Sequence, residues 1–156
     1  APAAMQTPVH VSFGGLFGTY ALLNAPGVFK RYNLVSPSIW WDDQLLVKQE
    51  ETLAAAQRGL EGKVFICAGG LERKANLAEA MKNMPPVMLA EYQKLDLSDR
   101  EPLMVEIVEP FAKRLAARGY KKLEVSHHIF EGETHNSVYA PALRRGLRTV
   151  FGTYKE

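Results

Sequence analysis

The stretch that decides the fold is His10-Val11-Ser12-Phe13-Gly14-Gly15. It places a serine between an extended, β-rich run over residues 8–12 and a helical run that follows the two glycines. A serine on such a strand-to-helix turn is exposed at the end of a sheet, where its hydroxyl can act as a nucleophile. The usual pattern for this turn is Gly-x-Ser-x-Gly, and His10 stands in place of its first glycine. The stretch therefore predicts a strand, a sharp turn that carries Ser12, and a helix.

Strand and helix patterns alternate along the rest of the chain. Further strands are predicted over 32–36, 63–68 and 122–130, with helices over 16–24, 42–58, 77–84, 106–118 and 138–151 and an irregular surface connection over 87–101. In the first helix, Leu16, Tyr20 and Leu23 are spaced for one buried face. This order predicts an α/β fold with a mostly parallel sheet that is covered by helices on both faces.

Composition indicates an ordinary globular protein. The 156 residues suit a single domain that spans 1–156, and 47% hydrophobic with 23% charged residues is typical of a folded chain. A net charge of +2 with both signs interspersed argues against a nucleic-acid surface, and no segment has the pattern of a membrane span. The single cysteine, Cys67, lies in a predicted strand and is expected in the core. Localisation stays open between the bacterial cytoplasm and periplasm.

Three polar residues follow predicted strands, at the sheet edge where ligands and catalytic groups gather. They are Ser12 after the first strand, Glu72 after the third and His135 after the fourth. A serine hydroxyl becomes a good nucleophile when a neutral imidazole takes its proton, and a carboxylate then fixes the tautomer of that imidazole. The order serine, acid, histidine therefore predicts Ser12 as nucleophile, His135 as base and Glu72 as acid, with the Phe13 N–H as an oxyanion donor.

Other interpretations of these residues remain open. Ser12 is also a suitable helix N-cap, Glu72 could be a solvated loop carboxylate, and His135 could be structural. Glu133 is a rival for the acid, and a serine–histidine pair without an acid is a third possibility. His127 and His128 lie on a predicted strand, which makes them weaker candidates for the base. No spacing of His, Cys and Asp residues suggests a metal site, and no other cofactor is expected.

Four segments resemble a known family: Ser12-Phe13-Gly14-Gly15-Leu16, Ser36-Pro37-Ser38-Ile39-Trp40-Trp41, Gly70-Leu71-Glu72 and Thr134-His135-Asn136-Ser137-Val138. Together they are similar to the bacterial putative-esterase family of α/β-hydrolases, which includes siderophore trilactone esterases and feruloyl esterases. The resemblance implies a serine-dependent carboxylic ester hydrolase that acts through an acyl-enzyme on siderophore-type or aryl esters. It also implies that Trp40 and Trp41 lie near the substrate pocket, although both suit core packing equally well.

The resemblance covers nearly the whole chain but only the second half of the family's fold. The chain therefore corresponds to an N-terminally truncated α/β-hydrolase domain in which the strand before Ser12 becomes a sheet edge. An edge strand exposes backbone groups, so we expect a homo-oligomer or a second polypeptide to cover it. The alternative function is a non-catalytic binding or assembly module, and acyl transfer to an alcohol or sugar is the runner-up among enzymes.

Overall fold

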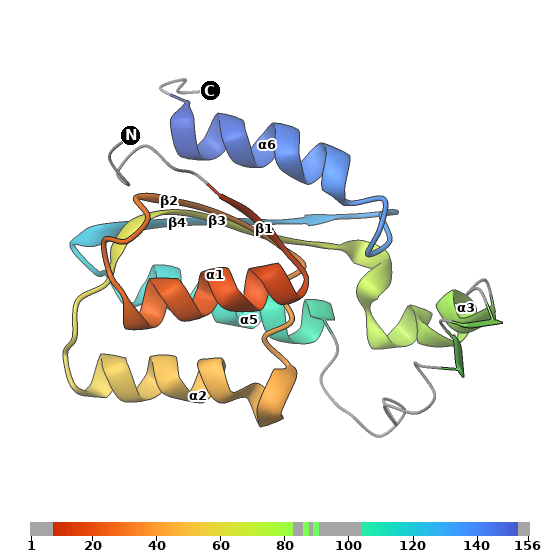
Figure 1. Cartoon of the computed structure of the whole chain (residues 1–156), viewed down its shortest axis with the longest axis horizontal. Coiled ribbons are helices and arrows are strands. Elements are labelled where there is room, and N and C mark those ends of the chain that lie inside the picture. The colour runs from red at the N-terminus through yellow and green to blue at the C-terminus, as the bar shows by residue number, and fades with distance from the viewer. Residues whose placement is uncertain (1–7, 83–85, 88, 91–103, 153–156) are drawn as a thin grey trace.

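A computed structural model describes residues 8–82, 86–87, 89–90 and 104–152 of the chain (Figure 1). Its elements are β1 (Val9–Val11), α1 (Phe13–Asn24), β2 (Arg31–Val35), α2 (Trp41–Ala55), β3 (Glu61–Gly69), η2 (Gly70–Glu72), η3 (Lys74–Asn76), α3 (Leu77–Lys82), α5 (Met104–Ala117), β4 (Lys122–Phe130) and α6 (Tyr139–Phe151). Within those residues, no helix is both long enough and apolar enough to cross a membrane.

The strands form one sheet in the order β1-β2-β3-β4, and each neighbouring pair is parallel. Helices α1 and α5 pack on one face, α2 covers them from outside, and α6 covers the other face (Figure 1). The predicted α/β class with helices on both faces is thereby confirmed. Because all strands are parallel, their carboxyl ends meet at one edge of the sheet, and every loop that carries a predicted site residue lies there.

Both faces of the sheet are buried, which explains the continuous apolar run over residues 64–68 of β3. On the side of α1 and α5, the core holds Tyr32, Leu34 and Ile66, each with no exposed surface. On the side of α6, Phe65 and Cys67 pack with Val138, Ala142 and Val150. Cys67 is therefore a core residue, as predicted, and burial raises the pKa of its thiol.

The predicted buried face of α1 is wrong at Tyr20. Leu23 is buried, but Tyr20 is 52% exposed. The helix instead approaches the sheet through small residues: a Cβ on Gly18 would lie 2.7 Å from Leu34 Cδ2, and Gly15 would meet Pro37 in the same way. The spacing of large apolar residues did not predict this face, because close packing of the helix here requires glycine.

The start of α2 also differs from the prediction. Asp42 and Asp43 were expected as acidic residues of an ordinary first helical turn. Both have positive φ, 51° and 52°, and so does Gln44, before the right-handed helix begins. Aspartate tolerates the left-handed region better than most residues, which allows this turn beside Trp41.

The remaining elements are close to the prediction. Helix α5 buries Ile107, Phe111 and Leu115, and Gly119, with φ +67°, follows its end. The expected surface connection over 87–101 lies mostly outside the described residues, although its described positions 87, 89 and 90 are helical and not irregular.

A buried carboxylate links α2 to α5. Glu50 has no exposed surface, and it accepts hydrogen bonds from Arg114 Nε at 3.0 Å and from Arg118 Nε at 3.0 Å. Glu50→Gln should lower the free energy of unfolding by about 2 kcal/mol, since hydrogen bonds to a charged acceptor are lost. Chemical denaturation measures this value. Glu51→Gln is the control, because that carboxylate is 55% exposed and its ion pair should contribute under about 1 kcal/mol. Equal losses would contradict the assignment.

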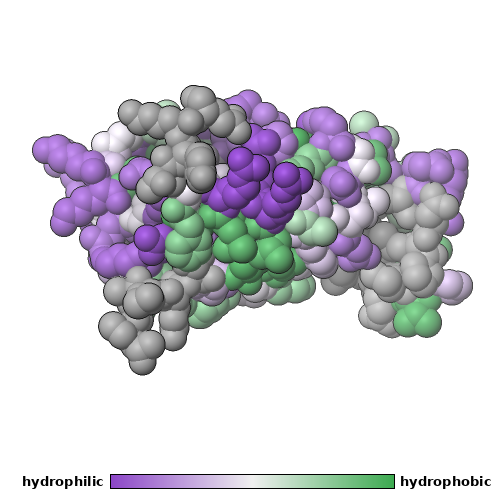
Figure 2. All heavy atoms as spheres, turned by 90° about the horizontal axis from the view of Figure 1, so that it is seen from above, coloured by the Kyte–Doolittle hydropathy of each residue, from purple (hydrophilic) through white to green (hydrophobic). Residues whose placement is uncertain are grey.

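An open edge and apolar side chains predict self-association. Strand β1 is an outer strand of the described sheet, and Phe13, Phe17 and Tyr20 on α1 are each more than half exposed. Figure 2 shows apolar residues exposed in the middle of one face of the molecule. We expect twice the monomer mass in light scattering at micromolar concentration. Val9→Lys on the edge should yield monomer and Val28→Lys should not, whereas a monomeric parent chain would refute the prediction.

Candidate active site

Ser12 occupies a strained turn between β1 and α1. Its φ of 54° and ψ of −119° are unfavourable for a residue with a side chain. Two hydrogen bonds hold the turn: the Ser12 N–H donates to the Val35 carbonyl at 3.0 Å, and the Ser12 carbonyl accepts from the Ser38 N–H at 3.0 Å. Ser12 is the N-cap residue of α1, but its hydroxyl makes no capping hydrogen bond to the helix. A strained conformation that neighbouring strands maintain is typical of functional positions.

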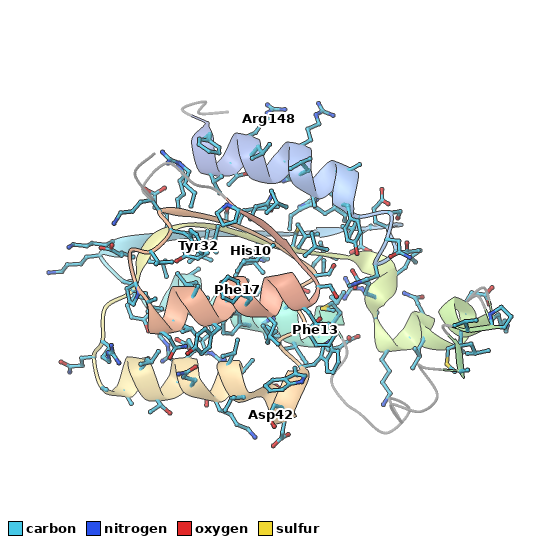
Figure 3. All side chains as sticks on the ribbon, in the orientation of Figure 1. His10, Phe13, Phe17, Tyr32, Asp42 and Arg148 are labelled. Carbon is cyan, nitrogen blue, oxygen red and sulfur yellow. The ribbon has the colours of Figure 1, made fainter. Side chains whose placement is uncertain are left out.

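His10 fits the turn although it replaces the expected glycine. The residue is only 7% exposed, and its ring lies 5.9 Å from the Phe17 ring and 5.7 Å from the Phe29 ring (Figure 3). The space comes from α1, because a Cβ on Gly18 would lie 2.7 Å from the imidazole. Burial lowers the pKa of His10, and the Gly14 backbone opposes that shift. His10 is therefore a buried residue that packs beneath the turn.

Glu72 and His135 form a hydrogen-bonded pair. His135 Nδ1 lies 2.6 Å from Glu72 Oε2, and the Glu72 side chain is only 8% exposed while that of His135 is 37% exposed. The other carboxylate oxygen, Oε1, accepts from the Gly69 N–H at 2.8 Å. The loop after β4 returns over the end of β3, where the Leu71 N–H donates to the Glu133 carbonyl at 3.0 Å. The two residues predicted as acid and base are thus brought together.

The rival residues lie elsewhere. Glu133 accepts a hydrogen bond from the Ser137 hydroxyl and makes none to His135. His127 and His128 lie within β4, and the His128 ring packs on Phe130 with 4.5 Å between ring centroids. Burial, followed by the nearby Arg145 charge, lowers the pKa of His128. In the part of the chain that the structure describes, no group of His, Cys, Asp and Glu residues is arranged to hold a metal ion.

Ser12 is hydrogen-bonded to a second serine rather than to the histidine. The Oγ atoms of Ser12 and Ser38 are 3.4 Å apart, and among the described residues no hydrogen bond joins Ser12 to His135. Ser38 itself is 2% exposed. The described contacts therefore place the Ser12 hydroxyl on Ser38 and not on the predicted base.

The predicted oxyanion donor and pocket residues lie at the same edge of the sheet as Ser12. Helix α1 begins at Phe13, and the first N–H groups of a helix have no partner within the helix. The Phe13 ring packs edge-on against Trp40 with centroids 5.9 Å apart (Figure 3). Trp40 is half-buried and contacts the core, whereas Trp41 is 44% exposed. Both tryptophans lie on the loop side of Ser12, and their role in a pocket stays a prediction.

Sequence reasoning assigned no role to two residues that join this site. Ser36 donates a hydrogen bond to Glu72 Oε1 at 2.5 Å, and Ser38 contacts Ser12. Both follow β2, so the rule that selected Ser12, Glu72 and His135, a polar residue after a strand, also applies to them. They were missed because a serine after a strand is common and lacks a distinctive partner in the sequence.

Comparisons with known proteins show what the whole chain is similar to. No family model matches the chain. The siderophore enterobactin esterase of Emericella nidulans is 28% identical over 144 residues, which cover 87% of this chain and 44% of that protein. The siderophore hydrolase EstA from Aspergillus nidulans superposes with a TM-score of 0.65 and 26% identity, over 90% of this chain and 45% of EstA.

The chain is similar to siderophore esterases over part of their fold. The crystal structure of the BES protein from Bacillus cereus supports this relationship with a TM-score of 0.65 and 26% identity, over 95% of this chain and 46% of that one. The resemblance to an esterase of the α/β-hydrolase type is therefore confirmed. The chain spans less than half the length of each of these proteins.

Proposed function

We propose that this chain carries the catalytic machinery of a serine-dependent carboxylic ester hydrolase. The observation that carries the proposal is the Glu72–His135 hydrogen bond of 2.6 Å, at the same sheet edge as the strained Ser12 turn. Homology to siderophore esterases supports ester hydrolysis at the family level. The names of these relatives favour a siderophore ester as substrate, and aryl esters are the second class that the motifs suggest.

The proposed mechanism begins with proton transfer from Ser12. Glu72 accepts the Nδ1–H of His135, which leaves Nε2 unprotonated as the base. Ser12 Oγ turns from Ser38, gives its proton to Nε2 and forms a C–O bond with the ester carbonyl carbon. The Phe13 N–H then donates to the oxyanion. The imidazolium protonates the departing alkoxide, the acyl group stays on Ser12, and a water activated by His135 releases the acid.

One observation favours the second candidate, a non-catalytic binding or assembly module. Ser12 and His135 are not hydrogen-bonded in the described residues, although hydrolases need that contact during the reaction. Catalytic hydrogen bonds are often long in free enzymes and shorten when substrate binds. In the proposed active form, the Ser12 hydroxyl leaves Ser38 and reaches His135. The module is supported if a well-folded chain hydrolyses p-nitrophenyl butyrate at the background rate.

Labelling with a fluorophosphonate probe tests the proposal. The parent chain should form a stoichiometric adduct that peptide mass spectrometry locates at Ser12, because the paired His135 raises the nucleophilicity of that hydroxyl alone. Ser12→Ala should give no adduct. Ser38→Ala is the matched control and should still be labelled, since Ser38 is only 2% exposed and has no histidine partner among the described residues. A folded parent chain that stays unlabelled would refute the catalytic proposal.

A further inference from the structure

We propose that Ser36 is a positioning residue for the acid Glu72, an inference that rests on the proposed ester hydrolysis. The Ser36 side chain has no exposed surface, and its hydroxyl donates to Glu72 Oε1 at 2.5 Å. It reaches the carboxylate from the neighbouring strand, because Ser36 follows β2 whereas Glu72 follows β3. Ser36 does not contact the predicted nucleophile or the base, so its effect on the reaction passes through Glu72.

The hydroxyl decides which carboxylate oxygen faces the base. Glu72 Oε1 receives both Ser36 Oγ and the Gly69 N–H, at 2.5 and 2.8 Å. With that oxygen occupied, Oε2 is left for His135 Nδ1 at 2.6 Å. A carboxylate held by one donor can turn about its terminal bond more freely than one held by two. Loss of the Ser36 hydroxyl should therefore weaken the orientation of His135 without emptying the site.

The backbone at Ser36 is constrained for this role. Its φ is +42°, a left-handed conformation that is uncommon for serine, and its N–H donates to the Cys67 carbonyl at 2.7 Å. The next residue, Pro37, lies against α1, where a Cβ on Gly15 would come within 2.6 Å of Pro37 Cα. A glycine would adopt this conformation more easily, so the serine carries a conformational cost that its bond to Glu72 explains.

The segment 36–38 therefore contacts both the acid and the nucleophile of the predicted triad. Ser36 contacts the acid, and two positions later the Ser38 N–H and hydroxyl contact Ser12. Close packing of Pro37 keeps these two contacts in a fixed relation. The functional consequence differs between them: Ser38 holds the resting nucleophile, whereas Ser36 holds the acid during every step.

The variant Ser36→Gly tests the role of the hydroxyl without disturbing the backbone conformation. Glycine removes the donor but suits φ +42°, which offsets part of the stability lost with the hydrogen bond, so the variant should remain folded at the assay temperature. For p-nitrophenyl butyrate, kcat should fall about 10- to 100-fold, as expected for the loss of a hydrogen bond to a charged group, while KM stays within about twofold. Gln57→Gly is the matched control: Gln57 is an exposed residue after α2 with φ +53°, and its variant should keep the parental kcat.

A proton NMR spectrum supplies a readout that does not need turnover. The Nδ1–H of His135, assigned by its absence in His135→Ala, should be a sharp downfield resonance in the parent chain. It should broaden through solvent exchange in Ser36→Gly and in Ser36→Ala, and remain sharp in Gln57→Gly. An unchanged resonance, or a kcat loss shared by Gln57→Gly, would overturn the role of Ser36. If the parent chain hydrolyses no ester, the proposed function fails, and the NMR comparison still decides the positioning role.

Discussion

Replacing His135 with alanine should lower ester turnover by on the order of 10⁴-fold or more, because the base that activates Ser12 is lost. Only His135 combines a carboxylate on Nδ1 with a place at the carboxyl ends of the strands. Steady-state hydrolysis of p-nitrophenyl butyrate measures the effect. The fall should be in kcat with little change in KM, since the imidazole transfers protons in the chemical steps and does not hold the bound ester.

Two other histidines of the chain serve as controls for this substitution. His127→Ala and His128→Ala remove the same side chain from β4, and each should retain turnover within about threefold, the ordinary spread of indirect effects. His128 packs on Phe130, so its variant also reports the cost of a lost aromatic contact on stability. Similar losses of turnover in all three variants would contradict the assignment of His135 as the base.

Glu72→Gln should lower kcat by on the order of 10⁴-fold, because an amide in place of the carboxylate favours the wrong histidine tautomer. The Gln side chain can donate an N–H to Nδ1, and the histidine proton then resides on Nε2. A protonated Nε2 cannot accept the proton of the Ser12 hydroxyl. Size and shape are conserved, so Ser36 and the Gly69 N–H keep an oxygen acceptor and the fold should persist. Circular dichroism and the thermal midpoint check the fold, and the p-nitrophenyl butyrate assay checks kcat.

Glu133→Gln is the paired control and decides among the three interpretations of the acid. The Glu133 carboxylate accepts from Ser137 in the same loop, so its amide variant should keep kcat within about threefold. A large loss in Glu133→Gln alone would reverse the assignment. Parental rates in both variants would mean that Ser12 and His135 work without an acid.

Strands and helices followed from local patterns, and so did the chain order of the site residues. The apolar run of β3 is continuous because both faces of the sheet are buried, which is also why this strand could be predicted from the sequence. Helix α1 was harder, because its buried residues include Gly15 and Gly18 beside Leu22 and Leu23, and glycines leave no signal in hydrophobic periodicity. His10 was an anomaly in sequence, and only the position of Gly18 explains how its ring is accommodated.

The carboxylate partner of His135 could not be chosen from the sequence. Glu133 is two residues from the histidine, whereas Glu72 is 63 positions away, so local spacing favours the residue that the fold does not use. Two features bring Glu72 to the imidazole of His135. They are the register of β3 against β4 and the close passage of residues 131–134 over Gly69 and Gly70. A Cβ on Gly69 would lie 2.4 Å from the Glu133 carbonyl oxygen, so the approach depends on glycine.

The sequence by itself determined the α/β class, the parallel sheet and the placement of Ser12, Glu72 and His135 after strands, because period and chain order are local properties. Tertiary structure decided the contacts among them: Glu72 rather than Glu133 on His135, Ser38 on Ser12, and Ser36 on Glu72. Those contacts join residues on neighbouring strands. Their distances depend on strand register and on backbone conformations such as the positive φ of Ser12 and Ser36, which no local pattern specifies.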